Sequence, residues 1–598
     1  MTRRIDTPAC LRHPGRVRDR RVGRGALALA LVCLAAPGRG GDDASPGELR
    51  VDATFNSLGV LWQVGGDDDG DSACLLEFRR VDEPTWRPGA PAVRARAGVL
   101  VGGEPLAASY WAASAMFLES GASYELRLTL TDPDGGGATL TATAATRSEP
   151  QPSPAGRRLH AVPGSGGGSG SAEDPFRGLQ SAADGVAPGD VVSVAPGRYA
   201  PFELAASGAE GLPIAFLGSG LGTEIVDGAG TERGVVTLSS GGSDPIAHVI
   251  VEGLTIENGR WGVDVQHGQS VTIRRNHIRA VDYGVVNRRE DGRERDQTVC
   301  DNVIEGRTGW PGTGIPSERG IDLRGTGNVV CHNRVRSFGD CVSVQPMSGP
   351  SYGNDVFGND LAFCVDDGIE VDFNQSNVRV WRNRVYNARM GVSLQPIRGG
   401  PAYVVRNELF NLESSPLKLN NSPSGLIVVH NTGVKLGAGV RDADDSTWRN
   451  ALFRNNLFLG TGYAFEFSSV SDDGSRDLDY GAWGTTRAGT AGEPHFKWDN
   501  QRYERLDDLR DATGREAHGV SAVFGDLANP APPASWDVAV EPAGRDLRLV
   551  PGAPEVDAGA PLPNLNDAFA VDGDPDLGAF ELGHPLPHYG PRPPAAVP

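Results

Sequence analysis

Residues 356–361 read VFGNDL, residues 380–385 read VWRNRV and residues 404–409 read VVRNEL, and this repeat decides the fold. Each copy holds an aliphatic residue, two variable residues, an Asn, one variable residue and a second aliphatic residue. The series comprises Asn276, Asn302, Asn333, Asn359, Asn383, Asn407, Asn431 and Asn455, and from Asn359 onward each step is 24 residues. A period of this length, built from strand patterns with no helical segment between them, predicts the coils of a right-handed parallel β-helix in an all-β chain.

The repeated Asn indicates a turn with a specific hydrogen-bonding pattern. Asn tolerates the left-handed αL conformation, and its side-chain amide can bond the Asn of the next coil. We therefore expect a ladder of Asn side chains along one corner of the β-helix.

A second strand follows the Asn, as in Gly368-Ile369-Glu370-Val371-Asp372. Its aliphatic residues must face the core, so its variable residues face solvent. Because parallel strands stack about 4.8 Å apart, outward residues of neighbouring coils form a column. The predicted column comprises Asp264, Val286, Asp322, Ser343, Glu370, Ser393, Lys418, Arg441 and Glu466.

Changes in composition divide the chain into segments. Residues 1–40 hold an Arg-rich start and the apolar run GALALALVCLAA at 25–36, the pattern of a cleaved secretory signal peptide. A run of this length cannot span a bilayer. Val32 stands where a lipoprotein cleavage motif requires a small residue, which disfavours a lipid anchor at Cys33. We expect a secreted or periplasmic protein without membrane insertion.

The remaining segments are a small β-sandwich, a linker, the β-helix and a C-terminal cap. Residues 48–146 alternate apolar and polar residues, and residues 147–170 are rich in Pro, Gly and Ser. The β-helix is predicted over 171–470, and 471–598 is predicted to be a helix-containing segment that caps it.

Charge and cysteine content narrow the partners and the compartment. The net charge of −20 argues against a nucleic-acid partner, because both would be negative. Among Cys74, Cys300, Cys331, Cys341 and Cys364 at most two disulfides can form, and buried apolar filling is the preferred interpretation. The sequence makes no prediction of oligomeric state.

Charged residues gather on the predicted column near the middle of the β-helix. So many carboxylates in one patch require a cation, a bound proton or nearby bases, and a functional site is the natural place for that cost. The predicted catalytic residues are Asp340, Asp366, Asp367, Arg389 and Lys418, and the predicted metal ligands are Glu370 and Asp372. Predicted substrate-binding residues are Arg319, Asp322, Arg324, Gln345, Gln395 and Asn420.

Two mechanisms fit these residues. In the first, carboxylates hold Ca²⁺, which binds a uronate carboxyl, and Lys418 removes the adjacent proton in a β-elimination. In the second, Asp340 and either Asp366 or Asp367 act as an acid and base pair across a glycosidic bond and hydrolyse it, with no metal required.

Residues 158–470 resemble the pectate-lyase-like superfamily of carbohydrate-active β-helices. The order Asp340, Asp366-Asp367 and Lys418 is similar to the acidic trio and basic residue of polygalacturonase-type hydrolases, but Met390-Gly391-Val392 stands where that family has Gly-His-Gly. Calcium-dependent β-helix lyases use a Lys base beside carboxylates, parts that Lys418, Glu370 and Asp372 would play.

A second resemblance concerns residues 48–146. The early Trp62 and the segment that ends at Tyr124 are similar to a fibronectin type III domain, in which a Tyr hydroxyl bonds the backbone. Such sandwiches serve as spacers or docking modules, and we assign no chemistry to this one.

Together these features favour a secreted protein that acts on a polysaccharide, with a uronate-containing chain as the expected partner. The leading hypothesis is a polysaccharide lyase that cleaves an acidic glycan by β-elimination, with Ca²⁺ as the expected cofactor. A glycoside hydrolase follows it, and then a C5-epimerase, which shares the proton-abstraction step. A non-catalytic glycan-binding or surface protein is the competing class, since a fold does not imply an activity.

Overall fold

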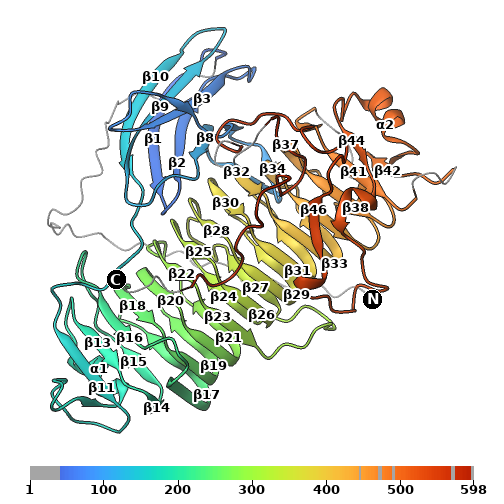
Figure 1. The fold of residues 1–598 in the computed structure, drawn as a ribbon. Coiled ribbons are helices and arrows are strands. Elements are labelled where there is room, and N and C mark those ends of the chain that lie inside the picture. The colour runs from blue at the N-terminus through green and yellow to red at the C-terminus, as the bar shows by residue number, and fades with distance from the viewer. Residues whose placement is uncertain (1–40, 443–445, 469–473, 488–491, 567–572, 594–598) are drawn as a thin grey trace, which may run out of the picture. The chain divides into compact units, whose positions relative to one another are not determined.

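The computed structural model describes residues 41–442, 446–468, 474–487, 492–566 and 573–593. The main part of these residues is a right-handed parallel β-helix, which confirms the predicted fold class (Figure 1). The predicted signal peptide lies outside the described residues. Within them, no helix has the length and apolar character needed to cross a membrane.

Each coil contributes to two large parallel sheets. The 14-stranded sheet runs from β12 (Phe176–Arg177) to β40 (Arg476–Asp479), and the 16-stranded sheet runs from β14 (Gly197–Tyr199) to β44 (Val520–Ala522). Pairing therefore continues past residue 470. Long strands of the second sheet, such as β29 (Asp360–Glu370), turn a corner, so that their first and last residues pair with different strands.

The ends of these long strands form, with two shorter strands, the surface that we call the site face. It consists of residues 261–265 of β19 (Thr255–Val265), residues 283–286 of β21 (His277–Asn287), β24 (Arg319–Leu323), β27 (Asp340–Val344) and the last residues of β29, β31 (Arg384–Ser393) and β33 (Glu408–Lys418). Its register confirms the predicted column from Asp264 to Lys418, whereas the predicted members Arg441 and Glu466 pair with each other in a separate sheet. The successive partners are Asp264, Val286, Asp322, Ser343, Glu370, Ser393 and Lys418.

The inward residues of the site face explain why this register is fixed. Val342, Ile369, Val392 and Leu417 are fully buried in the core of the β-helix. A slip of one residue would place the charged column in the core and these aliphatic side chains outside, so burial selects one register.

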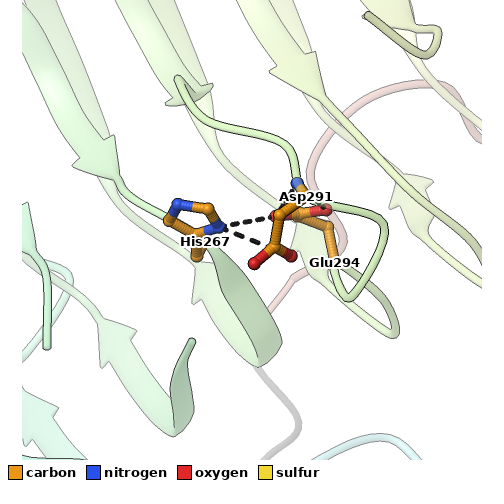
Figure 2. Close-up of side chains that lie close together, drawn as sticks. All are labelled: His267, Asp291 and Glu294. Carbon is orange, nitrogen blue, oxygen red and sulfur yellow. Dashed lines mark hydrogen bonds and ion pairs between the residues drawn. The ribbon is translucent and has the colours of Figure 1, made fainter. Parts of the chain in front are cut away.

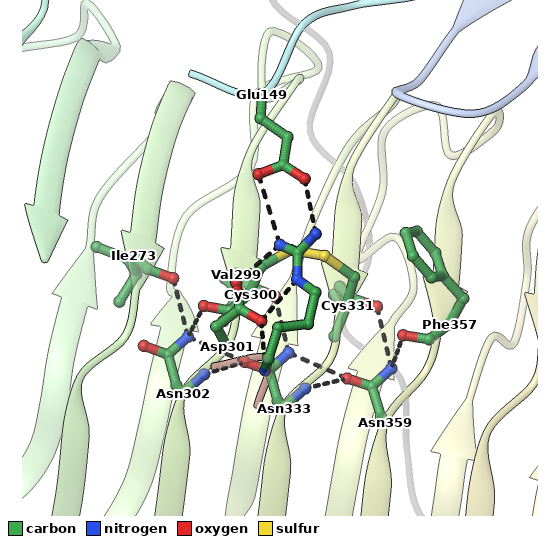
Figure 3. The surroundings of a disulfide bond; sticks show 12 residues. Glu149, Ile273, Val299, Cys300, Asp301, Asn302, Cys331, Asn333, Phe357 and Asn359 are labelled. Atoms are coloured by element: carbon green, nitrogen blue, oxygen red, sulfur yellow. Dashed lines mark hydrogen bonds and ion pairs between the residues drawn. A yellow bond between two sulfur atoms is a disulfide. The ribbon is translucent and has the colours of Figure 1, made fainter. Parts of the chain in front are cut away.

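The predicted Asn ladder is present (Figure 3). The Nδ2 atom of Asn302 donates a hydrogen bond to Oδ1 of Asn333 over 2.9 Å, and Nδ2 of Asn333 donates to Oδ1 of Asn359 over 3.1 Å. The ladder ends on Asn456, because Asn431 donates to that residue and not to the predicted Asn455. The last step is thus 25 residues.

The prediction that the Asn itself adopts the left-handed conformation is wrong, whereas the prediction that its amide bonds the Asn of the next coil is confirmed. The left-handed conformation belongs to the residue before each Asn, as at Arg382 (φ 51°) and Arg406 (φ 53°). The Asn itself is selected for its amide, which bridges two coils and satisfies buried backbone oxygens such as that of Val380.

Four of the five cysteines form disulfides, so the prediction that they are unpaired apolar filling is wrong. Cys300 bonds Cys331, its register partner on the next coil (Figure 3), and Cys341 bonds Cys364. Cys74 has no disulfide. The coil repeat brings Cys300 and Cys331 together as equivalent residues, whereas Cys341 and Cys364 meet although they are not register partners. Two disulfides are compatible with an extracellular protein.

The N-terminal segment is a small antiparallel sandwich. One 4-stranded sheet holds β1 (Ser45–Ala53), β2 (Leu58–Gly65), β8 (Tyr110–Ala115) and β5 (Val93–Ala95); the other holds β10 (Ala138–Ala145), β9 (Ser123–Thr131), β3 (Ala73–Arg80) and β4 (Arg87–Pro88). Trp62 and Tyr124 pack in its core, and the backbone N–H of Glu119 donates to the Tyr124 hydroxyl over 3.0 Å. Its assignment to the fibronectin type III class stays a prediction.

The C-terminal segment contains α2 (Leu506–Thr513) and the strands β45 (Leu527–Asn529) and β46 (Asp546–Leu549). Leu547 and Leu549 share a hydrophobic cluster with Tyr386 and Phe410 of the β-helix, so this segment covers outward-facing aromatic residues of the second sheet.

Candidate active site

Three carboxylates converge on the site face. Asp340 begins β27, and Asp366 and Asp367 lie one coil further along in β29. One oxygen of each lies within 4.8 Å of the others, and all three residues are buried. The backbone N–H of Asp367 donates to Oδ1 of Asp340 over 3.1 Å, which fixes the two coils relative to each other at this point. The sequence-predicted trio is therefore one cluster.

Basic side chains partner the two carboxylates of β29. The Lys418 ammonium lies 2.9 Å from Oδ2 of Asp367, although two coils separate them. Arg389 donates to Oδ1 of Asp366 over 3.2 Å. Oδ1 of Asp367 is buried and has no hydrogen-bond partner among the described residues. Lys418 and Arg389 thus compensate the negative charges of Asp367 and Asp366.

Arg319 joins Asp340 to the column. Its guanidinium lies 3.1 Å from Oδ2 of Asp340 and 3.3 Å from Oε2 of Glu370. The same Glu370 oxygen accepts hydrogen bonds from Ser343 (2.8 Å) and from the Gln345 side chain (2.7 Å). Glu370 is therefore surrounded by donors.

The other predicted residues lie around this network. Asp372 accepts hydrogen bonds from the Ser393 hydroxyl and the Gln395 backbone, both over 2.7 Å. Arg324 forms an ion pair with Asp322 at 2.6 Å. Asn420 lies half-buried, two residues beyond Lys418. Asp322 and Arg324 pair with each other. Their predicted role in binding the substrate stays a prediction.

Burial dominates the protonation of the carboxylates. Burial, reinforced by the charges of Glu370 and Asp367, raises the pKa of Asp340 well above its ordinary value. Burial also raises the pKa of Asp367 well above its ordinary value, against the opposing effect of Lys418. Burial and the nearby Glu370 raise the pKa of Asp372 to about 7. Asp340, Asp367 and Asp372 therefore hold protons at a pH where free carboxyls have lost them.

Lys418 responds in the opposite sense. Burial acts to lower its pKa, but the charges of Asp367 and Asp366 outweigh burial and raise the pKa above its ordinary value. Lys418 is consequently a firmly charged ammonium in this arrangement.

A second polar cluster, His267, Asp291 and Glu294, lies on another coil (Figure 2). One ligand atom of each lies within 4.8 Å of the others, which is a spacing that could hold a metal ion. However, Glu294 already accepts a hydrogen bond from His267 Nδ1 at 2.9 Å and others from the backbone of Asp291 and Gly292. These bonds fasten the loop at 288–297, and we assign the cluster that structural role.

Comparison with a family model supports the fold. Residues 261–458 match the family model described as "Right handed beta helix region". A search of the curated proteins found no match. The chain is similar to the solved structure of an alginate lyase from Paenibacillus sp. str. FPU-7, at 15% identity over 46% of this chain and 92% of that chain, with a TM-score of 0.30.

It is also similar to the catalytic domain of a GH87 α-1,3-glucanase in complex with nigerose, at 13% identity over 73% of this chain and 95% of that chain, with a TM-score of 0.28. Likenesses this remote carry no argument about activity.

Sequence reasoning missed two groups of residues on the site face. Ser343 and Ser393 were placed in the column but given no role, and they donate to Glu370 and Asp372. Trp261 and Tyr283 were not singled out. The sequence could have indicated them, because each lies two residues before an inward valine of the site face. Arg319 and Asp340 occupy the equivalent position in later coils.

Proposed function

We propose that the protein is a secreted glycoside hydrolase whose acid and base are Asp340 and Asp366. The observation that carries this proposal is the convergence of three buried carboxylates, one of which, Asp340, has a strongly raised pKa. Hydrolysis of a glycosidic bond can proceed through a carboxylic acid that protonates the leaving oxygen and a carboxylate that activates water. Asp340 supplies the proton, and Asp366, held by Arg389, accepts the proton of the attacking water.

Asp367 and Lys418 position this pair. The side chain of Asp367 is only 1% exposed, and its Oδ2 is bound to Lys418, so it does not reach a substrate directly. Its backbone N–H holds Asp340. The ammonium of Lys418 keeps the total charge of the cluster low enough for one carboxyl to stay ionised.

This assignment reverses the order of the two enzymatic hypotheses from the sequence. Elimination requires Lys418 to act as a base, and a base must be able to lose its proton near the working pH. The pKa of Lys418 is raised by Asp367 and Asp366, which makes it a poor base. The same argument disfavours the C5-epimerase, because that reaction begins with the same step.

Calcium does not fit the predicted ligands. Ca²⁺ requires several free oxygen ligands, but Oε2 of Glu370 accepts from Arg319, Ser343 and Gln345. The Arg319 guanidinium at 3.3 Å would also repel a cation. We therefore derive no step through calcium at Glu370 and Asp372. Asp340, Asp366 and Asp367 also have a spacing that could hold a metal ion, but Arg319, Arg389 and Lys418 already pair with them, so a chelator is expected to leave the activity unchanged.

The experiment is a product analysis on sodium alginate, polygalacturonate and soluble α-1,3-glucan oligosaccharides, each with and without chelator. New reducing ends without ultraviolet absorbance from unsaturated sugars indicate hydrolysis. Unsaturated products indicate a lyase and overturn the proposal. Binding without product supports the non-catalytic alternative.

Variants separate catalysis from folding. Asp340→Asn and Asp366→Asn are each expected to lower kcat by about two to four orders of magnitude, the usual contribution of general acid or base catalysis. Asp360→Asn is the matched control, because Asp360 lies in the same strand β29 but pairs with Arg334 and Arg384 away from the site face. It is expected to keep wild-type kcat.

A further inference from the structure

Two aromatic side chains lie on the site face, on coils before the carboxylate cluster. Trp261 of β19 and Tyr283 of β21 are register partners. Trp261 lies two residues before the inward Val263, and Tyr283 lies two residues before its partner Val285. Val285 pairs with Ile321, two residues after Arg319, and Ile321 pairs with Val342, two residues after Asp340. The order along this column is therefore Trp261, Tyr283, Arg319 and Asp340.

The two rings are not ordinary core residues. Both are half-buried, and neither belongs to a hydrophobic core cluster within the described part of the chain. Their centroids are 6.2 Å apart with planes tilted by 33°. Aromatic rings usually bury their surface in a core, so two neighbouring rings left half-exposed need another explanation, and contact with a partner is one.

The surroundings of the rings are charged but balanced. The guanidinium groups of Arg288 and Arg260 lie 4.3 and 4.7 Å from the Trp261 ring centroid. Arg288 pairs with Asp264 at 2.7 Å, and Arg260 pairs with Glu232 at 3.8 Å. Two guanidinium groups thus lie over the Trp261 ring, each paired with a carboxylate, and together with the neighbouring Tyr283 ring they offer apolar surface and hydrogen-bond donors to a sugar ring.

The inserted loop at 308–318 connects the aromatic pair to the reacting residues. The Ser317 hydroxyl lies 3.0 Å from the Tyr283 hydroxyl. The backbone carbonyl of the next residue, Glu318, accepts a hydrogen bond from the backbone N–H of Asp340 over 3.2 Å. The loop therefore contacts both Tyr283 and the strand that carries Asp340.

We propose that Trp261 and Tyr283 form a glycan-binding subsite, and that the substrate is a chain lying along the β-helix axis. This inference rests on the proposed function. Three strand spacings, roughly 14 Å, separate Trp261 from Asp340. Only a chain of several sugars spans that length, so a polysaccharide or long oligosaccharide is bound at both places and a disaccharide at one of them.

The test compares the double variant Trp261→Ala/Tyr283→Ala with the wild type on the three glycans named above. Initial rates are measured on the polymer and on the shortest oligosaccharide that is cleaved, and binding is measured by affinity electrophoresis in the Asp366→Asn background. The preference for polymer is expected to fall roughly tenfold, which corresponds to about 1.4 kcal/mol of aromatic stacking.

Trp86→Ala is the matched control. Trp86 is also half-buried and lies under two guanidinium groups, those of Arg79 and Arg127 at 4.7 and 4.3 Å, but it belongs to the sandwich. This variant is expected to retain the wild-type preference. The variant Trp261→Phe/Tyr283→Phe keeps the rings and is expected to restore most of the preference, which excludes a folding defect as the cause.

The outcomes separate this inference from the proposed function. If the wild type cleaves a polymer and the alanine variant keeps its preference, the subsite is wrong and hydrolysis stands. If the wild type cleaves nothing but binds a polymer, and the alanine variant loses that binding, the subsite stands and hydrolysis is wrong. Absence of both binding and cleavage for all three glycans overturns both.

Discussion

The substitution Lys418→Met tests the buried ion pair on which the assignment depends. Lys418 Nζ lies 2.9 Å from Oδ2 of Asp367, and the two side chains are 15% and 1% exposed. Removing one partner of a buried pair costs about 3–5 kcal/mol, because the other charge is left unpaired. Asp367 can instead take up a proton, so we expect the lower end, about 3 kcal/mol near pH 8.

The destabilisation caused by Lys418→Met must increase as the pH rises. Burial places the pKa of Asp367 above its ordinary value of 3.8, and Lys418 acts against this shift, so the substitution raises that pKa further. A carboxyl with a raised pKa in the folded state contributes stability that is complete below the unfolded pKa and is lost as the pH rises through the folded pKa. The variant should therefore match the wild type near pH 4 and become less stable as the pH rises.

The assay is urea unfolding followed by tryptophan fluorescence at about pH 4, 6 and 8. Arg177→Met is the control, because Arg177 lies 3.3 Å from Asp174 and the two side chains are 55% and 48% exposed. A pair of that kind is worth about 1 kcal/mol at most. Equal destabilisation of the Lys418 variant at pH 4 and pH 8, or none at pH 8, would refute the reasoning.

Three further predictions concern the ladder, a disulfide and a proton. Asn383→Ala removes bonds to Asn359, Asn407 and Val356 inside the β-helix and should cost about 2–4 kcal/mol by chemical denaturation, because several buried groups lose partners. Replacement of Cys341 and Cys364 by Ala, which removes a disulfide between residues 23 positions apart, should cost about 3 kcal/mol and lower Tm, and reductant should lower the Tm of this variant less than that of the wild type, because only the Cys300–Cys331 bond is left to reduce. Asp372→Asn removes a carboxyl with a pKa of about 7 and should make the loss of stability between about pH 5 and 8 smaller than in the wild type; an unchanged pH profile of Tm would contradict the pKa assignment.

The sequence was sufficient for the fold because one coil is repeated many times. The Asn spacing predicted the ladder, and the alternation of inward and outward residues predicted the column from Asp264 to Lys418. Both depend only on periodicity. The end of the ladder at Asn456 was missed because Asn455 fits the 24-residue spacing. A shift of one residue in the last coil cannot be recognised from the spacing alone.

The site was predictable as a set of residues but not as a set of contacts. Alignment of coils brought Asp340, Asp367 and Lys418 onto one surface. It could not predict that Lys418 reaches across two coils to Asp367, because side-chain length and direction are not part of a periodic pattern. That contact changes Lys418 from the expected base into a charged positioning residue. The Cys341–Cys364 disulfide was missed for the same reason, because these residues are not register partners, whereas the Cys300–Cys331 pair could have been predicted, since each Cys lies two residues before a ladder Asn.

The most direct test of the account is a crystal structure of the Asp366→Asn variant with a bound oligosaccharide from a glycan that the wild type cleaves. The account predicts a sugar chain along the site face, with a glycosidic oxygen within hydrogen-bond distance of Asp340 and sugar rings against Trp261 and Tyr283. A chain bound elsewhere on the β-helix, with Asp340 out of its reach, would contradict it.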